Sequence, residues 1–474
     1  MRTDELPPTP QTWIGQLGIS SPKRILVFLL CVGAALAILL LPAAQSGLGP
    51  PGKRALFILV LAAGLWMTEA IPAFAVGLLV IGLDIALLGT PRGGATDPRQ
   101  WEESIAVIGS PLVWLFFGGF VLAAGMARTG LDRRLATRLL HQLGENPRTL
   151  LFGVMGVTFV LSMFLSNTAT TAMMLAMLAP LIGAIDDEDP FAKSLLLGIA
   201  LAANVGGMAS LIGTPPNAIA VGALAKLDAP VKVDFLRWIL IAGPVAVFVC
   251  VVGGAWLVRR YPARVERVRL SAVPAIAGAE LAPLWQKLVM GLVLLLTIAL
   301  WMTSQWHSIP TAAVSLVPIV LLTTTGILEA RDIRGLNYDV LFLLAGGLAL
   351  GALVLRTGLS EWIVSGLPID DLGLTSVTLI LCYIAVLLSN LMSNTAAANL
   401  LVPLGLALAT GSEPRLALPL AMSASAAMCL PIATPPNALV YATDRLKARE
   451  FVRLGLLVGL VTPPLAVGIT ALWY

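Results

Sequence analysis

The most constraining feature of this sequence is the length of its apolar runs. Between Arg148 and Asp186, 37 consecutive residues carry no charged side chain. A hydrocarbon layer about 30 Å thick takes roughly 20 helical residues to cross, so this run is too long for one ordinary crossing and too short for two crossings with a loop. The 474 residues are 58% hydrophobic and 12% charged, with a mean hydropathy of +0.91. These values predict a polytopic membrane protein.

The membrane also restricts the fold class. Backbone groups within the hydrocarbon must find partners inside the protein, which leaves helices or closed barrels. The sequence contains no run of the period-2 alternation that barrel strands need. We therefore expect an all-α protein with about eleven transmembrane helices and two re-entrant hairpins, one of them formed by the 37-residue run.

Composition argues against several functional classes. The formal net charge of +4 is carried by loops, so it indicates membrane orientation rather than binding of nucleic acid. The four cysteines lie inside apolar segments without metal-type spacing, and the sequence has two histidines, so disulfides and a His/Cys metal site are not expected. No pairing of a nucleophile with a base is evident, and we do not expect an enzyme.

Two motifs occur twice in the same order. Ser-Asn-Thr stands at 166–168 and again at 393–395, and each copy is followed by a Thr-Pro-Pro-Asn turn, at 214–217 and 434–437. Glycine pairs, each followed by Arg-Thr-Gly-Leu, form a further matching set. These pairs lack the strand context of a nucleotide loop and indicate close helix packing. Because order and spacing are kept, we infer an internal duplication.

The motif spacing divides the chain into two repeats. The expected segments are a polar tail with the first transmembrane helix at 1–53, the first repeat at 54–258, a cytoplasmic linker at 259–283 and the second repeat at 284–474. If each repeat crosses five times, an odd number, the two copies are inverted relative to one another. Most Lys and Arg residues then fall on the inner side, as the positive-inside rule requires.

The repeated motifs also mark the candidate site. A single Ser-Asn-Thr in a transmembrane segment most often serves packing or an interhelical hydrogen bond, but its duplication at two hairpin tips favours a functional role. Hairpin tips and proline-broken helices leave backbone groups without helical partners, which is tolerated where they line a cavity. Helix amino ends suit an anion, and freed carbonyls suit a small hard cation. We predict an anion between the tips, with bound cations offsetting its charge.

These motifs resemble the divalent anion/sodium symporter family. The likeness rests on the paired Ser-Asn-Thr motifs, the two Pro-Pro-Asn turns and the Thr-Glu-Ala-Ile-Pro segment at 68–72, and it covers nearly the whole chain after the first helix. The family's bacterial dicarboxylate transporters imply a homodimer in the bacterial inner (plasma) membrane. Each protomer would have scaffold helices at 54–148 and 284–370, and a transport domain at 149–258 and 371–474 that moves as an elevator.

The resemblance also implies two sodium sites and one substrate site. The first sodium site would use Ser162, Ser166, Asn167 and the carbonyl of Gly213, and the second would use Ser389, Ser393, Asn394 and the carbonyl of Ala433. Substrate carboxylates would meet the two tips, and the turns would close the pocket. The residues implied for the substrate are Ser166, Asn167, Thr168, Thr214, Pro215, Ser393, Asn394, Thr395, Thr434 and Pro435.

The leading functional hypothesis is symport of sodium with a C4-dicarboxylate such as succinate, malate or fumarate, without an organic cofactor. A dicarboxylate exchanger of the same fold, or a citrate or sulfate transporter, stays open as an alternative. Hydroxyls, amides and backbone groups recognise these anions without revealing which one binds. An anion channel would need a continuous pore, whereas two broken helices favour a closed, alternating site.

One acidic residue, Asp84, falls inside the third predicted crossing. An intramembrane acid is a functional candidate by default. Its position in the second repeat is occupied by apolar residues, so we favour a structural or helix-end role for Asp84 over one in ion entry.

Overall fold

The computed structural model describes residues 22–40, 47–90, 99–186, 188–227, 231–268, 282–365, 372–409 and 411–474. Within these ranges every regular element is a helix and there is no strand, which confirms the predicted all-α fold class. Nearly all of the predicted polar tail and the centre of the predicted linker lie outside the described residues.

The first half of the chain alternates long apolar helices with short connecting ones. Its elements are α2 (Pro22–Leu39), α4 (Pro50–Thr68), α5 (Ala73–Leu87), α6 (Gln100–Ala106), η2 (Val107–Gly109), α7 (Pro111–Thr129), α8 (Leu131–His141), α9 (Pro147–Ser162), α10 (Asn167–Ala184), α11 (Phe191–Ala209), α12 (Pro215–Leu224) and α13 (Phe235–Arg260). The boundaries follow local chemistry: α7 begins with Pro in its first turn and ends at Gly130, whose φ is +67°.

The second half repeats the closing part of this order. Its elements are α14 (Leu284–Met302), α15 (Ser304–His307), α16 (Thr311–Val314), α17 (Leu316–Thr324), α18 (Ala330–Arg334), α19 (Tyr338–Arg356), α20 (Leu359–Ser365), α21 (Leu374–Leu391), α22 (Asn394–Leu408), α23 (Pro414–Ser425), α24 (Pro435–Tyr441) and α25 (Ala448–Ala471). The helical hairpin α21–α22, the interrupted pair α23–α24 and the long α25 follow the order of α9–α10, α11–α12 and α13.

Nine helices of the described chain are long and apolar enough to cross a membrane, when α6, η2 and α7 are counted as one. Four shorter apolar helices accompany them, at Ala73–Leu87, Pro147–Ser162, Thr311–Thr324 and Asn394–Leu408. These shorter helices include one arm of each hairpin. The structure thus supports a polytopic membrane protein, and the expected eleven crossings and the re-entrant course of the hairpins stay predictions.

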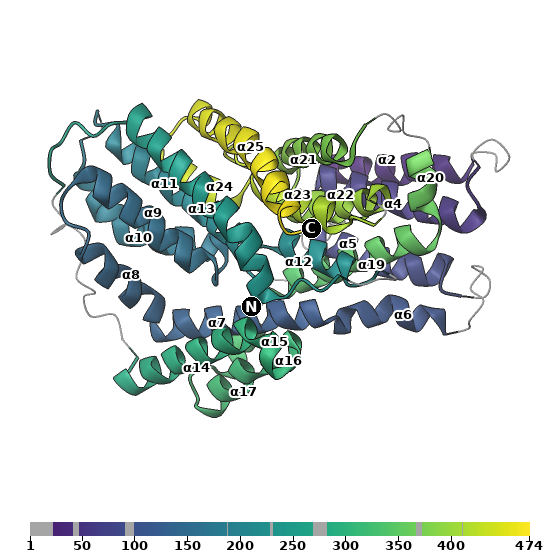
Figure 1. Cartoon of the computed structure of the whole chain (residues 1–474), viewed down its shortest axis with the longest axis horizontal. Helices are drawn as coiled ribbons and strands as arrows, with labels where there is room; N and C mark the ends of the chain where they lie inside the picture. The colour runs from purple at the N-terminus through teal and green to yellow at the C-terminus, as the bar shows by residue number, and fades with distance from the viewer. Residues whose placement is uncertain are drawn as a thin grey trace, which may run out of the picture.

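The helices form distinct groups in space. In Figure 1, α14, α16 and α17 lie together below α7 and contact it, whereas α9, α10, α11 and α13 gather above it. The helix α5 packs mainly against α19, and α23 packs against α21, α22 and α25. Partners far apart in sequence, such as α5 and α19, therefore hold the two halves together.

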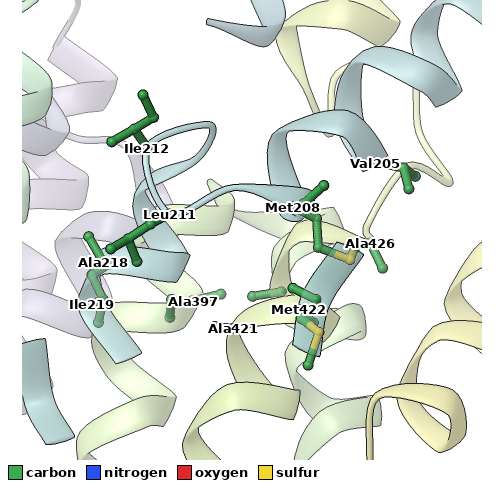
Figure 2. Packing of buried hydrophobic residues seen from close by; sticks show 14 of the residues in the cluster. Val205, Met208, Leu211, Ile212, Ala218, Ile219, Ala397, Ala421, Met422 and Ala426 are labelled. Atoms are coloured by element: carbon green, nitrogen blue, oxygen red, sulfur yellow. The ribbon is translucent and has the colours of Figure 1, made fainter. Parts of the chain in front are cut away.

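The helix α11 forms the centre of the group that carries the broken helices. Almost its whole length is buried, and it contacts α9, α10, α13, α23 and α24. Figure 2 shows the break that follows it, with Val205 and Met208 on α11, Ile212 in the connecting loop, and Ile219 on α12. Eight of the 19 residues of α11 are alanine or glycine, and such small residues let neighbouring backbones approach closely, as in many membrane helix interfaces.

Among the described residues, two ion pairs with a buried carboxylate join segments distant in sequence. Asp84 on α5 is buried and pairs with Arg356 at the end of α19. Lys193 on α11 pairs with Glu450 on α25 at 2.8 Å. A buried carboxylate is stable only with such a partner, so the structural interpretation of Asp84 agrees with its surroundings.

A glycine contact sets the distance between α5 and α19. A Cβ atom added to Gly346 would lie 2.1 Å from the Cα of Gly77, closer than any non-bonded contact allows. Gly346 belongs to one of the glycine pairs in the sequence, so the prediction that this pair permits close helix packing is confirmed.

We expect Gly346→Leu to prevent correct assembly, because backbone atoms of α5 occupy the space of the new side chain. Expression followed by size-exclusion chromatography in detergent should show loss of the monodisperse peak. Gly82→Ala on α5 is the matched control, because its Cβ would meet nothing within 4 Å. That variant should keep the wild-type Tm or gain stability, up to about 1 kcal/mol. A monodisperse Gly346→Leu protein with wild-type Tm would contradict the proposed packing.

Candidate substrate and sodium site

Both Ser-Asn-Thr tips and both proline turns face one cavity of about 260 Å³. Its wall is made by α7, the two tips, α11, the two turns and the start of α19. The lining residues are Phe116, Gly119, Phe120, Ala123, Phe164, Leu165, Ser166, Asn167, Thr168, Asn204, Ile212, Gly213, Thr214, Pro215, Asn337, Val340, Ser393, Asn394, Thr395, Ala433, Thr434, Pro435 and Pro436. Among these described lining residues none carries a charge.

The first tip is the turn between α9 and α10. Ser166 caps α10, and its Oγ accepts a hydrogen bond from the backbone N–H of Ala169 at 3.2 Å. Behind the tip, the Oγ of Ser162 lies 2.7 Å from both Asn167 Oδ1 and the carbonyl oxygen of Ala203. The Ser162 hydroxyl thus links the tip to α11.

The second tip repeats this geometry between α21 and α22. Ser393 caps α22 and accepts from the N–H of Ala396, again at 3.2 Å. Here, however, the Oγ of Ser389 and the Oδ1 of Asn394 are buried without a hydrogen-bond partner. Buried oxygens without a donor are costly, and a hard cation is one ligand that would satisfy them.

Each proline turn is held by one asparagine. The Nδ2 of Asn217 donates to the carbonyls of Met208 and Ser210, at 3.4 and 2.7 Å, and also to Gly207. The Nδ2 of Asn437 donates to Met428 and Leu430, both at 3.0 Å. In both repeats the asparagine thus binds the carbonyls nine and seven residues before it, which the broken helix leaves without helical partners.

Glycine at 207 allows the first tip to approach α11. A Cβ atom there would lie 2.4 Å from Asn167 Oδ1, so any larger residue would displace the tip. The carboxamide of Asn167 is therefore positioned by contact with the α11 backbone as well as by Ser162.

The structure brings the predicted site residues together. All ten residues predicted for substrate binding line the cavity, as do Gly213 and Ala433 from the predicted sodium sites. Ser162 and Ser389 do not line it, because they are buried behind the two tips. The roles of all these residues in binding stay predictions.

Sequence reasoning missed part of the wall. Phe116, Phe120, Asn337 and Val340 come from α7 and α19, and no motif marks them. Asn204 was also missed, although a signal existed: it is an amide inside the otherwise apolar stretch of α11.

The electrostatics of the cavity come from helix ends. α10 and α22 begin at the tips, and α12 and α24 begin at the proline turns. A helix amino end carries roughly half a positive elementary charge. At the tips it also offers free N–H groups that suit an anion, whereas the prolines that begin α12 and α24 have no N–H. A small anion can therefore be held here by dipoles, hydroxyls and amides without a basic side chain.

The fold and the cavity together define a polytopic membrane protein of the transporter class. Residues 22–474 match the family described as the sodium:sulfate symporter transmembrane region. The chain belongs to this divalent anion/sodium symporter family, as its motifs predicted. With its bacterial relatives and its spanning helices, it is a multi-pass protein of the bacterial inner membrane.

Two relatives illustrate the similarity. A sodium-dependent dicarboxylate transporter SdcS from Staphylococcus saprophyticus is 29% identical over 470 residues, which is 91% of this chain and 88% of the relative. Its counterpart from Staphylococcus aureus strain USA300 is 30% identical over 435 residues, 84% of this chain and 81% of the relative.

Two solved transporters share the fold at low sequence identity. The YdaH transporter of Alcanivorax borkumensis aligns with a TM-score of 0.53 at 14% identity, over 85% of this chain and 98% of its own. MtrF of Neisseria gonorrhoeae gives the same score and identity over 87% and 96%. At this identity the likeness concerns the fold alone.

We expect Asn217→Ala and Asn437→Ala each to destabilise the protein by roughly 2–3 kcal/mol, since each removes several buried hydrogen bonds that hold a proline turn against the end of the preceding helix. Thermal unfolding of the purified protein should show a lowered Tm for both. Asn146→Ala is a matched control, because Asn146 only caps the exposed start of α9 and its loss should cost about 1 kcal/mol. Equal Tm values for all three variants would contradict the role assigned to the two turns.

Proposed function

We propose that this protein is a secondary active transporter that couples sodium to the uptake of C4-dicarboxylates such as succinate, malate or fumarate. One observation carries the proposal: two equivalent tips and two equivalent turns surround a single cavity without a charged side chain. Such a cavity provides paired contacts for the two carboxylates of a dianion. The names of the SdcS relatives, sodium-dependent dicarboxylate transporters, support the same choice of ion and substrate.

Two sodium ions would organise the site. The first would be held by Ser162, Ser166, Asn167 and the carbonyl of Gly213, and the second by the equivalent set Ser389, Ser393, Asn394 and the carbonyl of Ala433. The partnerless oxygens of Ser389 and Asn394 support a cation at the second site. At the first site, the same hydroxyl and amide oxygen bond to each other, and a bound ion would replace that contact.

The cations explain how a dianion is stable in this cavity. Moving an unpaired charge into a low-dielectric interior costs on the order of tens of kcal/mol by Born estimates, and neutral donors offset only part of this. Sodium at the tips would neutralise the dianion and fix the loops that bind it. Substrate binding would therefore require bound sodium, which is the basis of coupled transport.

The carboxylates would meet the tips directly. Asn167 and Thr168 stand at the start of α10, and Asn394 and Thr395 at the start of α22, so their side chains and N–H groups can donate to opposite ends of the substrate. The turns at Thr214-Pro215 and Thr434-Pro435 would close the pocket between them.

The proposed movement is that of an elevator. The scaffold would comprise α4 to α8 and α14 to α20, and the transport domain would comprise the two hairpins, the broken helices, α13 and α25. This division supposes inverted repeats with re-entrant hairpins and a homodimer that anchors the scaffold. The cavity reaches Asn337 and Val340 at the start of α19, so its wall includes parts of both the proposed scaffold and the proposed transport domain.

Uptake into proteoliposomes tests the proposed function. An inward sodium gradient should drive accumulation of labelled succinate, and replacing sodium by potassium should abolish it. Uptake that ignored the sodium gradient yet required internal dicarboxylate would identify the exchanger instead. Competition by citrate, sulfate and glutamate then defines the substrate class, and sulfate or citrate competing better than any C4-dicarboxylate would overturn the assigned substrate.

We expect Asn167→Ala and Asn394→Ala to reduce sodium-driven succinate uptake at least 100-fold, since each removes contacts to both sodium and substrate. Both variants should keep the wild-type elution volume in size-exclusion chromatography. Asn146→Ala, which changes an asparagine outside the cavity, should retain near-normal uptake. Near-normal uptake by both tip variants would remove the tips from the mechanism.

A further inference from the structure

The carboxamide of Asn204 has an orientation set by its neighbours. Asn437 donates its Nδ2 to the carbonyls of Met428 and Leu430, at 3.0 Å each, so its Oδ1 must point the other way. That Oδ1 accepts from Asn204 Nδ2 at 3.2 Å, and Thr434 Oγ1 accepts from the same amide at 3.1 Å. Two acceptors therefore face the Nδ2 of Asn204. Turning the Asn204 carboxamide round would place its Oδ1 against the Oδ1 of Asn437, and neither oxygen can donate.

The remaining atom, Asn204 Oδ1, has no partner in the protein. Asn204 is 98% buried, its Oδ1 accepts no hydrogen bond, and the residue lines the same cavity as the tips and turns. A buried amide oxygen without a donor is unfavourable by about 1–3 kcal/mol. Because Asn204 lines the cavity, a ligand that brings a donor is one partner that would satisfy this oxygen.

This acceptor exists in only one of the two repeats. The turns are related by an offset of 220 residues, and the carbonyl pairs Met208 with Met428 and Ser210 with Leu430 keep that offset in their hydrogen bonds. The position equivalent to Asn204 is therefore Ala424, which has no polar side-chain atom. The tips and turns of the cavity are therefore present in both repeats, whereas the acceptor Asn204 Oδ1 is present in the first repeat only.

We propose that Asn204 Oδ1 accepts a hydrogen bond from a hydroxyl group on the carbon chain of the substrate, so that the site prefers 2-hydroxy-dicarboxylates such as malate. This inference rests on the proposed function. The duplicated contacts suit the two carboxylates, whereas the lone acceptor suits a substituent on one carbon only. A carboxylate cannot be its partner, because both groups only accept.

A third cation fits Asn204 less well than a hydroxyl. Hard cations take about six oxygen ligands, and the two polar atoms bonded to the Asn204 carboxamide, Thr434 Oγ1 and Asn437 Oδ1, face its Nδ2. One hydroxyl donor satisfies the oxygen without any such cage.

The wild-type protein provides the first test. Sodium-driven uptake of labelled succinate in proteoliposomes is measured against increasing malate, succinate and 2-methylsuccinate, which carries a methyl group in place of the hydroxyl. Malate should inhibit with a Ki roughly three- to tenfold lower than that of either compound without a hydroxyl, as one net hydrogen bond allows. Equal Ki values for malate and 2-methylsuccinate would overturn the inference.

The second test is Asn204→Ala. This variant also loses the bonds to Thr434 and Asn437, so uptake of every substrate should fall, and the readout is the ratio of the Ki values for malate and 2-methylsuccinate. That ratio should approach one. In the matched control Asn399→Ala, a buried asparagine with an equally unpartnered Oδ1 but outside the cavity, the wild-type ratio should be kept.

The remaining outcomes separate the hypotheses. If the ratio of Ki values is unchanged in Asn204→Ala, Asn204 serves packing and the inference is overturned. If Asn204→Ala instead raises the half-saturating sodium concentration equally for malate and succinate, Asn204 binds a cation and the inference is also overturned. If sodium drives succinate uptake without a preference for malate, the inference fails while the proposed function stands. If sodium drives uptake of neither compound, the proposed function fails and the inference fails with it.

Discussion

A helix that breaks inside a membrane leaves carbonyl groups without partners, and this structure meets that constraint with two asparagines. Asn217 and Asn437 each bind the carbonyls nine and seven residues before them. The two turns can therefore stay open at the cavity rather than winding into continuous helix. The start of α12 and of α24 at the cavity depends on these turns keeping their shape.

The tips depend on a different interaction, the fit between side chains and small residues. Gly207 leaves room for the carboxamide of Asn167, and Ser162 joins that carboxamide to α11. The second tip lacks these satisfied contacts, since the oxygens of Ser389 and Asn394 have no partner. Two half-sites with the same sequence motif thus differ in how many of their oxygens already accept a hydrogen bond.

The sequence predicted the all-helical fold and the residues of the two tips and turns, because each is marked by local chemistry: apolar length, duplication and paired prolines. The scaffold wall was not predictable in this way. Phe116 lies on α7 and Asn337 directly precedes α19, and tertiary packing sets how these helices face the cavity. The pairing of Asp84 with Arg356 joins residues 272 positions apart. Asn204 was predictable only in part. An amide in an apolar helix is visible in the sequence, but its hydrogen-bond partners are not.

The absence of a charged or titratable side chain from the described wall of the cavity has a consequence for how acidity acts on this protein. Between about pH 5 and 9 no wall residue changes its protonation state, because hydroxyls and amides do not ionise there. Any dependence of affinity on proton concentration that arises within the cavity in that range then reflects the acid–base equilibrium of the solute itself. The fraction of solute molecules that are fully ionised in the surrounding water, rather than the protonation of a residue in the cavity, would set how much solute binds.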